Sequence, residues 1–253
     1  MKVSVITVCF NSAKTIADTL RSVEGQSHPD VEHIIVDGGS RDGTLEIIAQ
    51  TANRIARLVS EPDRGIYDAM NKGLKLATGD IVGFLNSDDV YADSNSLEKI
   101  ERAFNDQSTE ACYGDLLFVA SDDPNRIIRY WQVGGYHPGR VLRGWMPPHP
   151  TFFVRRQIYE QEGGFDLSYT LAADFEMAVR LTYLRGLHMR YIPSTLVRMR
   201  MGGASNASVG NMVRANLETY RAVRKHGLPV SPLFMVKRIL SRLPQFFARP
   251  HKA

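Results

Sequence analysis

The sequence predicts an α/β domain with a mostly parallel central sheet flanked by helices, followed by a basic helical extension. Apolar, β-branched runs alternate with helix-compatible stretches four times over residues 3–85, which is typical of parallel strands covered by helices on both faces. The 253 residues with 43% hydrophobic content suit one globular domain. Residues 219–253 hold eight basic residues and no acid, and subtracting their +8 from the total of +4 leaves −4 for residues 1–218.

The elements of the first half follow from apolar runs and the polar residues that end them. Residues 3–9 are apolar and β-branched and predict a central strand, after which Asn11 and Ser12 offer an N-cap to a helix that extends to about residue 23. Further strands are expected at 32–37, 57–60 and 81–85, with helices after residue 44 and over 66–76.

The second half is less regular. Helices are expected over 96–105, 156–162, 171–185 and 211–226, and strands over 111–119, 127–131, 151–154 and within 189–201. Residues 127–131 alternate in polarity and predict an edge or antiparallel strand. Three prolines around His149 predict a stiff, extended segment over 147–150. Residues 1–205 are expected to form the α/β domain and residues 206–253 the extension.

Several classes of protein are disfavoured by what the motifs lack. The loop after the first strand contains no GxGxxG, and the chain has no GxxxxGK[ST], so dinucleotide-fold and P-loop interpretations lose their main support. The two cysteines, Cys9 and Cys112, are far apart and do not predict a zinc site or a disulfide framework. With no recognisable signal peptide or membrane span, a cytoplasmic location is expected.

Polar loops at the carboxyl ends of the predicted parallel strands indicate a ligand site. In such sheets the ligand crevice lies beyond these strand ends, so the loops that hold Phe10, Asp37, Arg64 and Asp88 should converge. Asp37 is followed by glycines that allow close backbone approach, which favours binding of a base or ribose. The alternative is a turn in which Asp37 only caps the backbone.

The acidic turn Asn86–Asp89 follows the apolar run at 81–85 directly. Carboxylates at a strand end are suitable ligands for Mg²⁺ or Mn²⁺, with positions left open for a diphosphate. A solvated acidic turn is the alternative interpretation of the same residues.

Three further positions carry polar groups whose role the pattern alone leaves open. His149 is a candidate contact to a phosphate or an acceptor sugar, although a histidine bonded to its own loop is equally common. Asp174 lies in the first turn of a predicted helix, where an acid is favoured as a cap or by the helix dipole whatever the function. The turn with Gly203 and Ser205 is flexible enough to approach a ligand.

The basic tail predicts contact with an anionic membrane surface. Residues 233–243 have the apolar and basic faces of an interfacial helix, and two phenylalanines follow at 246–247. The interleaved apolar residues suit lipid better than nucleic acid, so no nucleic-acid partner is expected. A terminal helix docked on the core is the alternative. The expected location is the inner face of the cytoplasmic membrane.

Four motifs occur in one order along the chain, at 5–11, 35–44, 79–89 and 173–176. With them the chain resembles a family 2 glycosyltransferase with the GT-A fold, a Rossmann-like architecture, over residues 1–205. The segment EPDRGIYDAMNKG at 61–73, together with MGGAS at 201–205, resembles more closely the bacterial transferases that build colanic acid and other exopolysaccharides.

The resemblance implies a metal-dependent, inverting hexosyltransferase that moves a sugar from a nucleoside-diphosphate-sugar to an acceptor hydroxyl. The implied nucleotide-sugar contacts are Thr7, Phe10, Asn11, Asp37, Arg64, Asn86 and Asp88, with Arg64 the weakest match. Asp88 matches the metal-binding acid of the DxD motif, so Mn²⁺ or Mg²⁺ is expected there with support from Asp89. Asp174 matches the catalytic base. The implied acceptor is a lipid-linked oligosaccharide in bacterial cell-surface polysaccharide synthesis.

The chain departs from the family pattern at two positions. Asn86 replaces the first acid of DxD, and Gly38 replaces the second acid of the frequent Asp-Asp-Gly-Ser. These changes keep open a non-catalytic sugar-nucleotide-binding protein. A nucleotidyltransferase is a further alternative, but the loop after the first strand lacks the glycines and the Arg or Lys expected of one. The QxxRW motif of processive synthases is missing, which favours addition of a single sugar.

Overall fold

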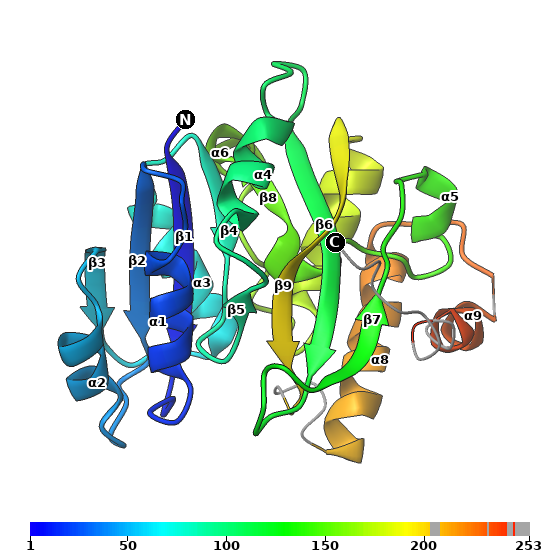
Figure 1. The fold of residues 1–253 in the computed structure, drawn as a ribbon. Coiled ribbons are helices and arrows are strands. Elements are labelled where there is room, and N and C mark those ends of the chain that lie inside the picture. The colour runs from blue at the N-terminus through cyan, green and yellow to red at the C-terminus, as the bar shows by residue number, and fades with distance from the viewer. Residues whose placement is uncertain (203–207, 232, 242–244, 246–253) are drawn as a thin grey trace.

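The computed structural model describes residues 1–202, 208–231, 233–241 and 245. Within these residues one nine-stranded sheet runs through the molecule in the order β3-β2-β1-β4-β8-β6-β9-β5, and β7 pairs with β6 (Figure 1). Helices cover the sheet on both faces. The α/β architecture expected from the alternating pattern is therefore confirmed.

The first half of the sheet is parallel. It consists of β1 (Val3–Cys9), β2 (Val31–Asp37), β3 (Ile55–Ser60) and β4 (Ile81–Phe84). The register pairs Cys9 with Asp37, and Asp37 with Ser60. Because parallel strands end at the same edge of a sheet, this register brings the three following loops to one edge.

The helices of this half are α1 (Ile16–Glu24), α2 (Thr44–Thr51) and α3 (Ile66–Leu76). The bounds of α3 are those predicted. The predicted N-cap of α1 at Asn11 or Ser12 is wrong, since Thr15 precedes the first helical residue. Asn11 instead adopts a left-handed backbone with φ 49°. Its backbone N–H and side chain bond to the loop after β2, so they are engaged away from the helix.

The second half of the sheet mixes parallel and antiparallel pairs. Its strands are β5 (Val90–Tyr91), β6 (Ala111–Val119), β7 (Ile127–Trp131), β8 (Phe153–Arg155) and β9 (Met189–Arg200). The bounds of β6 and β7 are those predicted, and β7 is antiparallel to β6 as expected. The extended segment predicted around His149 is wrong there, because His149–Thr151 forms a 3₁₀ turn in which Thr151 bonds back to Pro148.

The remaining helices pack around this mixed half. They are α4 (Ser96–Ala103), α5 (Pro138–Val141), α6 (Arg156–Glu162), α7 (Ala173–Ala178), α8 (Val209–Lys225) and α9 (Phe234–Leu240). The single helix expected over 171–185 is α7 followed by a π-helical segment, Val179–Leu184. The inner faces of α8 and α9 contribute Ala222, Val223 and Phe234, all fully buried, to the same hydrophobic cluster as Phe175 of α7.

Candidate active site

A cavity of about 690 Å³ lies at the carboxyl edge of the parallel half. The structure brings five of the predicted site residues together in its wall, namely Phe10, Asn11, Asn86, Asp88 and Asp89. They come from the loops after β1 and β4, which the parallel register places side by side. A cavity of this size holds a ligand as large as a nucleotide sugar.

The loop after β1 is held in place by its neighbours on both sides. The backbone N–H of Asn11 donates to Ser40 Oγ at 2.8 Å, and the side-chain oxygen of Asn11 accepts from the backbone N–H of Arg41. A hydrogen bond of 2.8 Å joins the hydroxyls of Ser12 and Ser87. The ring of Phe10 remains 63% exposed, so it offers an aromatic face on which a base can stack.

Asp37 is fully buried and organises the loop after β2. Its carboxylate accepts hydrogen bonds from the backbone N–H groups of Gly39 and Ser40, both at 3.0 Å, and from Ser60 Oγ at 2.7 Å. Burial alone would raise the pKa of Asp37, but the hydrogen bonds outweigh it and lower the pKa. The carboxylate therefore carries its charge next to the cavity and fixes the loop that faces Asn11.

Three predicted nucleotide-sugar contacts, Asp37, Thr7 and Arg64, lie outside the wall of this cavity. Thr7 is fully buried in β1, where its hydroxyl forms a 2.9 Å hydrogen bond with His33 Nε2. Arg64 pairs with Asp68 at 3.0 Å and lines a different pocket, between α3 and residues 156–167. A nucleotide contact by Arg64 requires its guanidinium to leave Asp68.

Buried oxygens without partners lie in the acidic turn. Asn86 Oδ1 and Asp89 Oδ2 have no hydrogen-bond partner within the described part of the chain. Burial raises the pKa of Asp88, and burial together with the charge of Asp88 raises the pKa of Asp89 well above its usual range. Unpaired oxygens and carboxylates whose charge is costly to bury are what a divalent cation satisfies.

The described residues contain no cluster of three or more His, Cys, Asp or Glu side chains that holds a metal by itself. This agrees with the way Mg²⁺ is usually bound, through one or two carboxylates together with phosphate oxygens of the substrate. The acidic turn therefore fits a cation that arrives with a diphosphate.

Arg200, at the end of β9, is a cavity residue that the sequence did not indicate. Its guanidinium donates to the backbone oxygen of Asp88 at 3.0 Å and to Asp18 at 2.6 Å, and its backbone N–H donates to Asp89 at 3.3 Å. It is 7% exposed. Arg200 thus holds the acidic turn and brings a positive charge to the wall of the cavity.

Asp63 explains one departure from the family pattern. A Cβ atom added at Gly38 would lie 2.5 Å from Asp63 Oδ2 and 3.3 Å from the ring of Phe10. A side chain at position 38 would therefore displace Asp63, whose carboxylate occupies that space and lines the cavity.

A second cavity, of about 240 Å³, contains Asp174 and His149 in its wall. Most of the remaining wall residues are apolar, with Trp131, Met199 and Met212 among them, but the wall also includes Arg129, Asn216 and Arg238. Met199 also lines the first cavity, so the two cavities adjoin at this side chain.

Asp174 is held from two sides within this second cavity. Its Oδ1 accepts a hydrogen bond from the hydroxyl of Tyr67 at 3.1 Å and from the backbone N–H of Phe175 at 2.8 Å. Burial and the adjacent carboxylate raise the pKa of Tyr67 well above its usual range, which keeps this hydroxyl a donor. Asp174 is not an N-cap, because Ala172 occupies that position and Asp174 lies within the first turn of α7.

His149 lies beside Asp174 but is largely apolar in its contacts. Its ring stacks on Phe84 with a centroid distance of 5.1 Å, and its Nε2 is buried without a hydrogen-bond partner within the described residues. Burial lowers the pKa of His149, so the ring is neutral at pH 7. Gly203 and Ser205 lie outside the described residues.

Known proteins with similar sequences are glycosyltransferases. Residues 4–173 match the family described as Glycosyl transferase family 2. A PGL/p-HBAD biosynthesis glycosyltransferase of Mycobacterium bovis is 30% identical over 211 residues, covering 81% of this chain and 80% of the relative. An uncharacterized glycosyltransferase of Mycobacterium tuberculosis is 33% identical over 183 residues, covering 70% of this chain and 68% of the relative.

Solved structures show the same fold. S. aureus TarS 1–349 in complex with UDP-GlcNAc has a TM-score of 0.69 at 19% identity, with 98% of this chain and 73% of TarS covered. The mannosyltransferase PcManGT of Pyrobaculum calidifontis, in complex with GDP-Man and Mn²⁺, has a TM-score of 0.67 at 21% identity, with 97% and 73% covered. The chain is a glycosyltransferase and belongs to glycosyl transferase family 2.

Proposed function

We propose that this glycosyltransferase moves a sugar from a nucleoside-diphosphate-sugar to an acceptor hydroxyl in one inverting step. The observation that carries the proposal is that the two cavities share the wall residue Met199. One cavity contains the acidic turn, whose Asn86 and Asp89 oxygens are unpaired within the described ranges, and the other contains the carboxylate of Asp174. An in-line displacement needs this arrangement, with the leaving group on one side of the sugar and the base on the other.

The larger cavity is the proposed donor site. The exposed ring of Phe10 stacks on the base, Asp37 supports the loop after β2, Thr7 ties β1 to β2 through His33, and Asn86 bonds to the ribose. The structural neighbours in complex with UDP-GlcNAc and with GDP-Man favour a uridine or guanosine diphosphate sugar as donor. Arg200 lies where it counters the charge of the diphosphate.

Asp88 is the proposed ligand of Mn²⁺ or Mg²⁺, with Asn86 and Asp89 as nearby oxygens. The PcManGT structure contains Mn²⁺, which supports a divalent cation here. When bound, the cation stabilises the negative charge that develops on the departing diphosphate.

Asp174 is the proposed general base. Its Oδ1 is occupied by Tyr67 and the backbone of Phe175, which leaves Oδ2 to accept the proton of the acceptor hydroxyl. An α-linked donor then gives a β-linked product, because the attack comes from the face opposite to the leaving group.

The proposed acceptor is a lipid-linked oligosaccharide in cell-surface polysaccharide synthesis. The smaller cavity has a mostly apolar wall that also holds polar groups, among them Asp174, His149, Arg129 and Arg238, which suits a sugar attached to an apolar group. The mycobacterial relative is named as a PGL/p-HBAD biosynthesis glycosyltransferase.

The membrane surface is the proposed location, on the cytoplasmic side. Exposed apolar side chains occur at helical spacing on α8, at Val209, Val213 and Leu217, and again on α9, at Val236, Ile239 and Leu240. Exposed cations lie next to them at Arg214, Arg221, Arg224 and Lys237. Such a surface binds anionic lipid by apolar insertion and by charge. None of the helices in the described ranges is long and apolar enough to span a bilayer.

The function is tested by incubating the full chain with radiolabelled UDP- and GDP-sugars and Mn²⁺. A transferase releases sugar slowly to water even without its acceptor, and its release stops when EDTA removes the cation. Nucleotide binding detected by thermal shift without release of sugar from any donor would instead support the non-catalytic alternative.

A further inference from the structure

The inner face of α8 forms hydrogen bonds and ion pairs with residues 166–176, the segment that carries Asp174. Helix α8 lies beyond the residues that match the family. The carboxylate of Glu218 on α8 accepts hydrogen bonds from three successive backbone N–H groups, those of Thr170 at 3.0 Å, Leu171 at 2.8 Å and Ala172 at 3.0 Å. It also accepts from the hydroxyl of Thr170 at 2.7 Å. One carboxylate therefore accepts from the backbone N–H groups of the three residues that directly precede α7.

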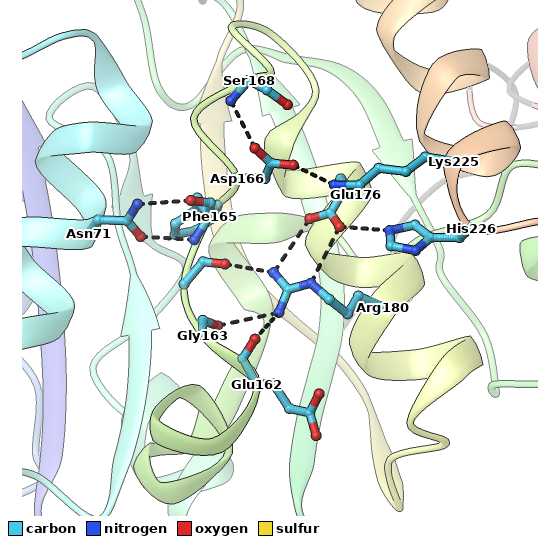
Figure 2. Close-up of polar contacts among 11 residues, drawn as sticks. Asn71, Glu162, Gly163, Phe165, Asp166, Ser168, Glu176, Arg180, Lys225 and His226 are labelled. Carbon is cyan, nitrogen blue, oxygen red and sulfur yellow. Dashed lines mark hydrogen bonds and ion pairs between the residues drawn. The ribbon is translucent and has the colours of Figure 1, made fainter.

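The carboxyl end of α8 holds the same segment at two more points (Figure 2). Lys225 Nζ lies 2.6 Å from Asp166 Oδ2, and His226 Nε2 forms a 2.7 Å hydrogen bond with Glu176. Glu176 is 1% exposed and also pairs with Arg180, which donates to backbone oxygens of residues 162–164. The contacts of α8 thus lie on both sides of Asp174 in the sequence.

Helix α7 has no cap of its own. Its N-cap residue is Ala172, whose side chain has no acceptor, and an uncapped helix start is poorly fixed. Burial alone would raise the pKa of Glu218, but the hydrogen bonds outweigh it and lower the pKa, so the group is a carboxylate at pH 7. Three aligned N–H groups that face one charged carboxylate fix the backbone more firmly than neutral bonds do.

We propose that α8 is part of the catalytic apparatus and that Glu218 is a positioning residue for Asp174. Glu218 fixes the backbone of residues 170–172 by accepting their hydrogen bonds, and Tyr67 of α3 fixes the carboxylate of Asp174 by donating to it. Together they aim the free oxygen of Asp174 into the cavity, whose wall also includes Ala215 and Thr219 of α8. The inference rests on the proposed role of Asp174 as the base.

The test compares Glu218→Ala and Glu218→Gln with Glu98→Gln, a control glutamate on α4 that pairs with Arg102 near the surface. The measured rate is release of UDP or GDP from UDP-N-acetylglucosamine or GDP-mannose with Mn²⁺, using the donor that the wild type turns over. A small displacement of a catalytic group costs up to about 100-fold in rate. We expect kcat to fall about 10- to 100-fold in Glu218→Ala, less in Glu218→Gln, which keeps one acceptor, and not in Glu98→Gln.

Nucleotide binding separates positioning from loss of fold. In Glu218→Ala the fraction of protein that binds UDP or GDP, and its Kd, should match the wild type while kcat falls. A binding fraction that falls by the same factor as kcat would show that Glu218 only stabilises the fold, and would overturn the proposal.

A double-mutant cycle with Asp174→Asn tests whether Glu218 acts through the base. We expect Glu218→Ala to have almost no further effect on the residual rate of Asp174→Asn. Equal losses in both backgrounds would overturn the positioning role. Wild-type rate in Glu218→Ala, with Asp174→Asn inactive, would overturn this inference but leave the proposed function intact, whereas an active Asp174→Asn would overturn both.

Discussion

At the scale of single residues, the site is defined by which oxygens are engaged and which are free. Asp174 has one oxygen held by Tyr67 and the backbone, and in the acidic turn two oxygens, of Asn86 and Asp89, have no partner among the residues that the structure describes. Engaged atoms fix geometry, and free atoms are available to substrate, proton or cation. The sequence indicates the reactive groups, but their partners come from distant segments.

Asp88→Asn tests the metal-binding role. Asparagine preserves the shape of the side chain but removes the charge that a divalent cation needs. We expect Mn²⁺-dependent affinity for UDP or GDP to weaken by at least about tenfold, equivalent to ~1.4 kcal/mol, with little change in stability.

Isothermal titration calorimetry with and without Mn²⁺ measures this effect. Asp122→Asn, an exposed acid paired with Arg126, serves as the control. Unchanged Mn²⁺-dependent affinity in Asp88→Asn would show that the cation is held elsewhere.

At the scale of elements, long or strongly patterned segments could be predicted and context-dependent ones could not. Helix α3 and strands β6 and β7 have the predicted bounds, because their own apolar pattern determines them. The two-residue strand β5 exists only because β9 pairs with it. The predicted N-cap of α1 is wrong because Asn11 bonds to the loop after β2, some thirty residues away in the sequence.

The same limit explains the outcome at the site. The loops with Phe10 and Asp88 could be placed at one edge from the parallel pattern alone. Arg200 and Glu218 could not be assigned to the site in this way. Arg200 bonds to the acidic turn and Glu218 to the loop before α7, and both partners are distant in the sequence. An arginine that ends a strand just before a glycine-rich turn was the available signal for Arg200.

Strand β2 carries a carboxylate that should make the protein sensitive to acid. Glu32 accepts hydrogen bonds from Lys2 at 2.8 Å, Ser4 at 2.6 Å and the backbone of Thr78 at 2.7 Å. Burial alone would raise the pKa of Glu32, but these bonds outweigh it and lower the pKa from 4.5 to about 2. Because the folded pKa lies below the unfolded one, the stabilisation is complete above pH 4.5 and is lost as the pH falls toward 2.

Glu32→Gln should therefore reduce the free energy of unfolding at pH 7 by on the order of 2 kcal/mol and flatten its dependence on pH below 5. Urea unfolding at pH 7, 5 and 3 measures the difference, with Glu98→Gln as a surface control. A constant difference between Glu32→Gln and the wild type across this pH range would contradict the assigned linkage.

In the molecule as a whole, the two halves of one sheet form the walls of different proposed binding sites. The parallel half supplies most of the proposed donor site, and the mixed half, with helix α7 that carries Asp174, supplies the mostly apolar wall of the proposed acceptor cavity. Helices α8 and α9 lie beside the mixed half (Figure 1), with inner faces in the core and exposed apolar residues outside. One pair of helices thus links the proposed membrane surface to the segment with the base.

Leu217→Ser tests the membrane surface. Leu217 on α8 is 64% exposed, and burying a leucine side chain in an apolar environment contributes about 1.5–3 kcal/mol. We expect the variant to bind phosphatidylglycerol-rich liposomes at least about tenfold more weakly in flotation experiments.

The matched control is Leu58→Ser, a leucine on β3, 45% exposed at the far edge of the sheet. It should bind liposomes like the wild type. If Leu217→Ser and Leu58→Ser bound liposomes equally well, the protein would contact lipid at another surface or not at all.

Asp174→Asn tests whether Asp174 is the base of the glycosyl transfer. Asparagine keeps the hydrogen bonds from Tyr67 and Phe175 to Oδ1 but cannot accept a proton. The measurement is sugar release or transfer from the preferred donor, together with nucleotide affinity. We expect the rate to fall by about 10²- to 10⁴-fold with nucleotide affinity unchanged. A rate near that of the wild type would show that Asp174 is not the base.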